Sequence, residues 1–206
     1  MLGFYNYTVI LTYIGMLAGF TGITAALSGN IHTAMVLLMV AGVCDMFDGA
    51  IASTRERTRE EKNFGIQIDS LSDLICFGIL PAVITCAIGG TGGFSFFAAG
   101  IYVLAALIRL AWFNVDEQER QLNETGSREV YLGLPVTSAA LVLPILSELA
   151  HLMGFSMMKA APTALFVMGI MFLCPIRLRK PAIIGKAVMV IVGVIAMAFL
   201  LLGFDV

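Results

Sequence analysis

Charged residues are scarce in this chain. Only 13% of its 206 residues are Asp, Glu, Lys or Arg, whereas 59% are hydrophobic. A soluble globular domain has about 25% charged residues, so this composition excludes an ordinary soluble core with a polar exterior. An excess of basic residues is also lacking, because the formal net charge is −2. The chain therefore has no electrostatic footprint for binding nucleic acid.

Cysteine pairs and long polar segments are missing as well. The four cysteines form no CxxC pair and lie in or beside apolar segments, which argues against a zinc site or a structural disulfide. No polar stretch is long enough to form a second domain. We therefore expect residues 1–206 to form one integral membrane domain, with membrane lipid as its surroundings.

Long apolar stretches make up most of the sequence. A spanning helix needs about 20 mainly apolar residues, and seven stretches approach that length, although the sixth is short and flanked by prolines. They are too long for strands and do not alternate. The sequence predicts an all-α fold, a polytopic membrane helix bundle with six core transmembrane helices and one or two more. The stretches are approximately Thr8–Ser28, Ile31–Ala52, Ile66–Ile88, Phe94–Asn114, Tyr131–Met153, Ala161–Cys174 and Ala182–Leu202.

The basic residues predict the orientation of the bundle. With the N-terminus in the cytoplasm, the loops after the second, fourth and sixth stretches face the cytoplasm. Only Lys159 of the twelve Lys and Arg residues then falls in an outer loop, while Arg109 and Lys186 lie inside helices near their cytoplasmic ends. The other nine lie in the three inner loops, as the positive-inside rule requires. We expect a protein of the cytoplasmic membrane.

Five acidic residues lie within the apolar stretches, and all but Glu148 are concentrated around one predicted cytoplasmic loop. Asp45 and Asp48 are three residues apart at the end of the second stretch, and Asp69 and Asp73 are four apart near the start of the third. An ionisable group in the bilayer costs roughly 2.5 to 3.5 kcal/mol on insertion scales. Both spacings place the two carboxylates on one helix face, and antiparallel neighbouring helices would bring the two faces together.

A divalent cation is the natural partner for such a group of acids. Four crowded carboxylates repel one another strongly at low dielectric, and the second and third stretches contain no Lys or Arg. Carboxylate oxygens are hard ligands that suit Mg²⁺, Mn²⁺ or Ca²⁺. Small residues, Gly49, Ala52 and Gly65, adjoin the acids and leave space for a substrate or for close helix packing, and the sequence leaves both interpretations open.

These residues together resemble a known signature. The run Asp45-x2-Asp48-Gly49-x2-Ala52, followed by Gly65-x3-Asp69-x3-Asp73, is similar to that of the CDP-alcohol phosphotransferases. Ser70 and the following Phe77-Gly78 resemble the phosphatidylserine synthase branch of that family. Two further runs, residues 108–115 and 133–138, resemble the same branch. The resemblance covers roughly residues 5–145.

Two positions depart from the family pattern. The arginine that follows Ala52 in the signature, which in the family helps to hold cytidine diphosphate, is Ser53 here, and the spacer to Gly65 is a few residues longer. Arg55 or Arg57 in the longer loop is a candidate to replace that arginine. The second arginine of the branch pattern around Arg109 is Trp112.

The resemblance implies a reaction and a site. It implies transfer of a phosphatidyl group from CDP-diacylglycerol to L-serine, at the cytoplasmic face, with release of CMP. It also implies two Mg²⁺ or Mn²⁺ ions at the four aspartates, with Asp73 as the general base, and a homodimer. The expected substrate-binding residues are Gly49, Ala52, Ser53, Arg55, Gly65, Ser70 and Arg109.

Three alternatives remain at this stage. The acceptor could be another alcohol, glycerol phosphate or inositol phosphate; Ser70 and Phe77 argue against it, while Ser53 keeps it open. The acids could belong to a cation or proton transporter, although the sequence shows no internal repeat and the acids lie near one face. An inactive structural relative is the third alternative, motivated by Ser53 alone.

Overall fold

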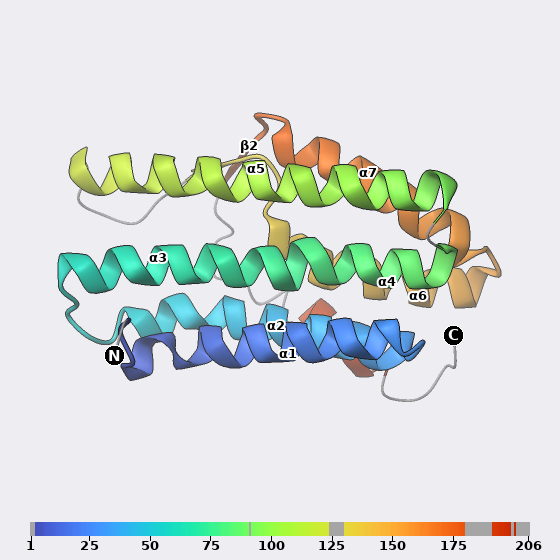
Figure 1. Ribbon diagram of the computed structural model, residues 1–206, viewed down its shortest axis with the longest axis horizontal. Helices are drawn as coiled ribbons and strands as arrows, with labels where there is room; N and C mark the ends of the chain where they lie inside the picture. Colours follow the sequence, from blue (N-terminus) through green and yellow to red (C-terminus); the bar gives the residue numbers. More distant parts are fainter. Residues whose placement is uncertain (1–2, 91, 124–129, 180–190, 199, 201–206) are drawn as a thin grey trace.

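The computed structural model describes residues 3–90, 92–123, 130–179, 191–198 and 200. The helices in this part of the chain run lengthwise in a bundle, with α3 and α4 joined end to end (Figure 1), which confirms a helical bundle. A six-residue π-helix joins α3 to α4, and single turns of 3-10 helix, Tyr7–Val9 and Val136–Ser138, precede α1 and α6. The α-helices are α1 (Ile10–Leu27), α2 (Ile31–Ala52), α3 (Arg59–Asp73), α4 (Leu80–Gly89), α5 (Gly93–Asn123), α6 (Ala139–Met153) and α7 (Met157–Leu173).

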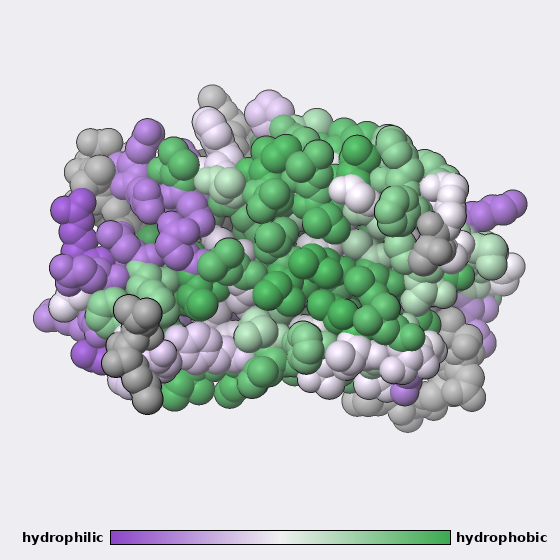
Figure 2. Space-filling view, in the orientation of Figure 1, coloured by the Kyte–Doolittle hydropathy of each residue, from purple (hydrophilic) through white to green (hydrophobic). Residues whose placement is uncertain are grey.

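Five helical segments in the described residues are long and apolar enough to cross a membrane. An apolar surface covers the middle of the bundle, while hydrophilic side chains gather at the end that holds the N-terminus (Figure 2). The chain is thus an integral membrane protein. A sixth core span is not confirmed, because α7, with 17 residues, is shorter than each of the five segments that could cross a membrane. The five segments are Tyr7–Leu27, Ile31–Ala52, Arg59–Gly89, Gly93–Glu119 and Val136–Met153.

Two predicted loops proved to be partly helical. The third helix begins at Arg59 and not at Ile66, because Thr58 and Glu61 form a capping box in which each side chain accepts the other residue's backbone N–H. The helix thus starts within polar sequence. The fourth, α5, continues nine residues past Asn114, so the expected loop 115–130 is helical over its first half.

The fifth predicted stretch begins too early. Residues 130–132 form β1, which pairs antiparallel with β2 (Arg177–Arg179), and Tyr131 lies opposite Leu178. Helical structure starts only after Pro135, since Gly133 has a φ of +77° that breaks any helix. The seventh stretch, Ala182–Leu202, falls largely outside the described residues, of which 191–198 are helical.

Close contact between α1 and its neighbours positions the helices that carry the acids. A Cβ on Gly19 would lie 2.5 Å from Sγ of Cys76, and one on Gly15 would lie 3.1 Å from Cβ of Cys44. These glycines therefore let the backbones of α1, α2 and the π-helix approach closely, as small residues do in membrane bundles. The ends of α2 and α3 that hold the aspartates are consequently fixed against α1.

The π-helix, Leu74–Ile79, begins directly after Asp73. Pro81 follows it and has no N–H to donate to the carbonyl of Phe77 four residues earlier. The fully buried Tyr102 of α5 donates its hydroxyl to that carbonyl oxygen at 2.6 Å. The π-helix and the Tyr102 hydrogen bond accommodate Pro81, so that the chain stays helical from Arg59 to Gly89. Such π-turns occur often at functional sites, and this one directly follows Asp73.

Candidate functional site

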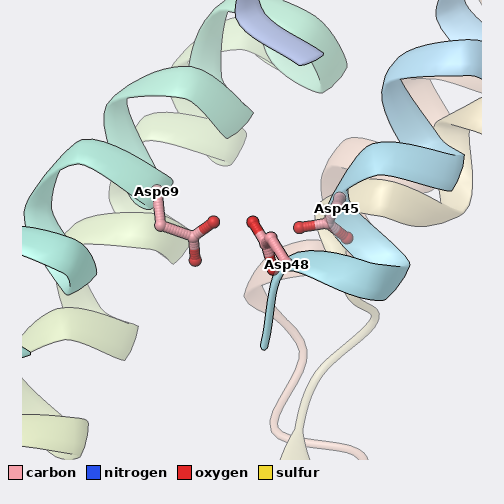
Figure 3. A group of neighbouring side chains, drawn as sticks. All are labelled: Asp45, Asp48 and Asp69. Atoms are coloured by element: carbon pink, nitrogen blue, oxygen red, sulfur yellow. The ribbon is translucent and has the colours of Figure 1, made fainter. Parts of the chain in front are cut away.

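Three aspartates converge between α2 and α3. One carboxylate oxygen from each of Asp45, Asp48 and Asp69 lies within 4.8 Å of the other two, and the three residues are half-buried. Figure 3 shows the side chain of Asp69 pointing from α3 toward the two from α2. The expected convergence of the two helix faces is therefore observed.

The acids also pair across the two helices. Asp45 and Asp73 are within hydrogen-bonding reach of each other, as are Asp48 and Asp69. This pattern follows from antiparallel neighbours, because the earlier acid of α2 meets the later acid of α3. Asp73 lies outside the group of three and adjoins it through Asp45.

The group of three has the spacing of a cation site. Metal–oxygen bonds of about 2.1 to 2.6 Å place two ligand oxygens of one hard cation at most about 4.2 to 5.2 Å apart. The limit of 4.8 Å among Asp45, Asp48 and Asp69 falls within that range. The three side chains could hold a metal ion, and carboxylates favour Mg²⁺, Mn²⁺ or Ca²⁺ over softer metals.

A third helix contributes to the group. Thr12 of α1 is buried, and its hydroxyl donates a hydrogen bond to Oδ2 of Asp48 at 3.2 Å. Its carbonyl oxygen also accepts the hydroxyl of Ser72 at 3.5 Å. Thr12 thus connects α1 to both acid-bearing helices. Sequence reasoning missed it, and the only signal was a hydroxyl within an apolar run.

The small residues next to the acids occupy different surroundings. Gly49 is exposed, and a Cβ added there would meet nothing within 4 Å, so the space beside Asp48 is open. Ala52 is half-buried, and Ser53 caps the end of α2 with its hydroxyl donating to the carbonyl of Ala50 at 2.7 Å. A Cβ at Gly65 would lie 3.1 Å from Nη1 of Arg57.

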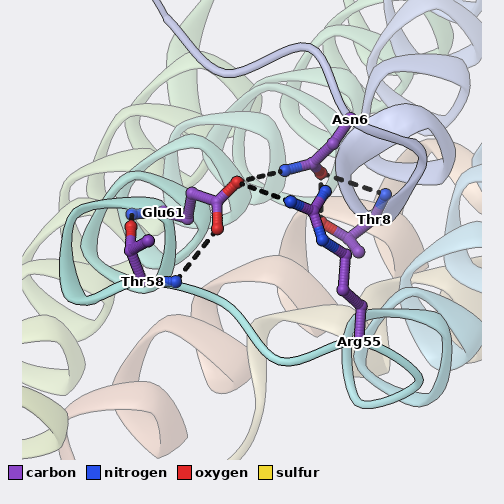
Figure 4. Close-up of polar contacts among 5 residues, drawn as sticks. All are labelled: Asn6, Thr8, Arg55, Thr58 and Glu61. Carbon is purple, nitrogen blue, oxygen red and sulfur yellow. Dashed lines mark hydrogen bonds and ion pairs between the residues drawn. The ribbon is translucent and has the colours of Figure 1, made fainter.

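The segment between α2 and α3 is held by one carboxylate. Oε1 of Glu61 accepts the amide of Asn6 at 3.0 Å and pairs with Nη2 of Arg55 at 3.5 Å, while Oε2 accepts the backbone N–H of Thr58 (Figure 4). Arg55, expected to contact substrate, therefore faces Glu61. Tyr7 adds a hydroxyl contact to Thr54 at 3.1 Å. The N-terminal residues and this segment form one connected unit.

Two other expected substrate contacts lie farther along the chain. Ser70 is buried, and its hydroxyl donates to Oδ1 of Asn114 on α5 at 2.6 Å. Arg109 of α5 is also buried, and its Nη2 donates to the carbonyl of Gly133 at 3.5 Å. Both side chains tie α5 to neighbouring segments, and their contact with a substrate stays a prediction.

Comparisons with known proteins agree on one family. The model of the family described as "CDP-alcohol phosphatidyltransferase" matches residues 5–202. A CDP-diacylglycerol–serine O-phosphatidyltransferase from Saccharomyces cerevisiae is 37% identical over 143 residues, 64% of this chain and 51% of the relative. An archaetidylserine synthase from Methanothermobacter thermautotrophicus is 29% identical over 65% of this chain and 54% of its own.

A third relative is covered more fully. It is a CDP-diacylglycerol–serine O-phosphatidyltransferase from Bacillus subtilis, 26% identical over 69% of this chain and 76% of its own length. The chain thus spans about half the length of the yeast and archaeal relatives and three quarters of the Bacillus one.

Proposed function

The chain belongs to the CDP-alcohol phosphatidyltransferase family, and on that premise we propose that it transfers a phosphatidyl group from CDP-diacylglycerol to L-serine. The products would be phosphatidylserine and CMP. The convergence of Asp45, Asp48 and Asp69 carries this proposal, because a diphosphate substrate needs concentrated positive charge that bound cations can supply. The relatives named for serine transfer support the choice of acceptor.

We infer that the aspartates hold Mg²⁺ or Mn²⁺, as a two-metal site. Asp45, Asp48 and Asp69 would provide the ligands, with Asp73 adjoining them through Asp45. When bound, such cations neutralise the diphosphate and stabilise the departing CMP. The protein's own contribution is to position the cations and the substrate, since catalysis of phosphoryl transfer consists mostly of aligning the reacting groups and stabilising charge.

Asp73 is the proposed general base. It lies one turn farther along α3 than Asp69, on the same face, and so farther from the polar start of that helix than Asp69. A carboxylate there would take the proton of the serine hydroxyl as its oxygen bonds to the phosphorus that bears diacylglycerol. The bond from that phosphorus to the oxygen of the CMP phosphate breaks, and CMP leaves.

Several finer statements belong to the same proposal. The hydrophilic end of the bundle, where the α2–α3 segment lies (Figure 2), would face the cytoplasm, so serine and CMP would exchange with that compartment across the cytoplasmic membrane. The open space beside Gly49 would admit the nucleotide. Residues 1–206 would act as a single domain and the protein as a homodimer.

One assay tests the proposal. The purified protein in detergent receives CDP-diacylglycerol, Mg²⁺ or Mn²⁺ and, separately, serine, glycerol phosphate or inositol phosphate, while CMP release is measured. We expect release with serine, slowed by about 10² to 10⁴ in Asp73→Asn. Glu60→Gln, which removes an exposed acid from the first turn of the same helix, is the matched control and should retain the rate.

Three results would contradict parts of this account. Release with another alcohol but not with serine would reassign the acceptor. An unimpaired Asp73→Asn variant would remove Asp73 as the base. Absence of release with every alcohol would favour a transporter or an inactive relative.

A further inference from the structure

Arg57 differs from its neighbours in the segment that joins α2 to α3. It is half-buried, whereas the other residues from 53 to 60 are exposed. Its Nη1 atom lies 3.1 Å from the place where a Cβ on Gly65 would be. The guanidinium is thus folded back against the bare backbone of α3, where a side chain at position 65 would crowd it.

The guanidinium lies on the same face of α3 as the aspartates. Gly65, Asp69 and Asp73 are spaced four residues apart and therefore lie along one face of α3. Four residues rise about 6 Å along a helix, so the Arg57 side chain lies about one turn from the carboxylate of Asp69 on the cytoplasmic side. A substrate anion bound by cations at the three acids would extend toward this position.

The Arg57 guanidinium is also uncommitted within the described part of the chain. No hydrogen bond or ion pair joins it to another described residue, whereas Arg55 pairs with Glu61 at 3.5 Å; the charge of Arg57 acts on Glu61 only at longer range. Both oxygens of Glu61 are already engaged, by Asn6, Arg55 and the Thr58 backbone. The nearby acid therefore holds Arg55 and the segment in place and leaves Arg57 free to bind an anion.

We propose that Arg57 binds a phosphate oxygen of the CDP diphosphate and replaces the signature arginine that Ser53 lacks. This inference rests on the proposed function and assigns the role to Arg57 instead of Arg55. A guanidinium suits the task because its planar fork donates two parallel hydrogen bonds to a phosphate. Gly65 serves the same purpose, since its missing side chain makes room for the fork. Arg55 is then a positioning residue that acts through Glu61.

Nucleotide binding tests this assignment without the acceptor. The full chain in detergent with Mn²⁺ is titrated with CDP, and the KM for CDP-diacylglycerol is measured in parallel. Arg57→Gln should weaken CDP binding and raise this KM by about tenfold or more, as loss of a charge-assisted hydrogen bond does, while the KM for serine stays unchanged. Arg57→Lys should be intermediate, because it keeps the charge and loses the fork.

Two further variants sharpen the result. Arg59→Gln removes an exposed arginine two residues away, at the start of α3, and controls for the general loss of positive charge; it should leave CDP binding unchanged. Ser53→Arg in the Arg57→Gln background should restore binding. CDP binding that survives Arg57→Gln, or falls equally in Arg59→Gln, would overturn the Arg57 assignment alone. A wild-type protein that fails to bind CDP would overturn the proposed function as well.

Discussion

The hydroxyl of Thr12 donates a hydrogen bond to Oδ2 of Asp48 at 3.2 Å. Groups that orient a metal ligand typically change metal affinity by 10- to 100-fold when removed. We therefore expect Thr12→Val to raise the Mg²⁺ or Mn²⁺ concentration needed for half-maximal activity by about ten- to a hundredfold, with a smaller effect on the rate at saturating metal. Thr12→Ser should restore the affinity.

A matched control lies on the same helix. Thr24 is exposed, and its hydroxyl donates to the carbonyl of Thr21 in the same helix, so Thr24→Val should leave the metal dependence unchanged. If Thr12→Val lowers the maximal rate but leaves the metal concentration for half-maximal activity unchanged, Thr12 does not orient Asp48 for metal binding.

Gly49→Ala should separate folding from substrate binding. A Cβ at this position meets nothing within 4 Å of the protein, and alanine favours a helix over glycine by about 1 kcal/mol. The variant should be as stable as the wild type or slightly more stable, yet show a several-fold higher KM for CDP-diacylglycerol. Thermal unfolding and initial rates in detergent measure the two effects.

Gly100 provides the comparison for that variant. It is an exposed glycine of α5 with equally open surroundings and lies far along the chain from the acids. Gly100→Ala should have little effect on stability and should leave the KM for CDP-diacylglycerol unchanged. An unchanged KM in Gly49→Ala would show that the open space beside Asp48 is not used by substrate.

Tyr102→Phe should destabilise the bundle. The substitution removes the hydroxyl that donates to the Phe77 carbonyl, and an unsatisfied buried acceptor costs about 1 to 3 kcal/mol. Denaturant unfolding in detergent measures the loss of unfolding free energy. Tyr7→Phe, which removes an exposed hydroxyl contact to Thr54, should cost less than about 0.5 kcal/mol. Equal stabilities of the two variants would contradict the role given to Tyr102.

Divalent cations should stabilise the folded chain. Binding at the three aspartates removes repulsion between them, and a ligand at a hundred times its Kd adds about 2.7 kcal/mol to the free energy of unfolding. We expect Mn²⁺ to raise the unfolding temperature and excess chelator to lower it and abolish activity. Asp48→Asn should show little of this shift, whereas the exposed Glu60→Gln should show all of it. A shift of equal size in both variants would place the cation elsewhere.

The sequence predicted the apolar helices well and their polar ends poorly. Ile31–Ala52 was predicted with its observed bounds, because hydrophobic length alone defines such a helix. The start of α3 was missed, since Arg59 to Asn63 is polar and hydropathy assigns it to a loop. The capping box of Thr58 and Glu61 was the local signal that could have placed this start.

The candidate site shows the same division. The spacing of Asp45, Asp48, Asp69 and Asp73 predicted their convergence, because helical periodicity fixes which side chains share a face. The contact from Thr12 could not be predicted, since no pattern within α1 reports what packs against it. Likewise, only the folded segment shows that Arg55 is engaged by Glu61 while Arg57 lies over Gly65.

Glu61 joins parts of the chain that are 55 residues apart, because a single carboxylate oxygen receives both Asn6 and Arg55. Position 6 and the α2–α3 segment therefore have to vary together. A chimaera whose α3 began without Glu61 would leave Asn6 without this acceptor unless position 6 were exchanged with it. The geometry of the segment beside the aspartates thus depends on a residue that precedes the first helix.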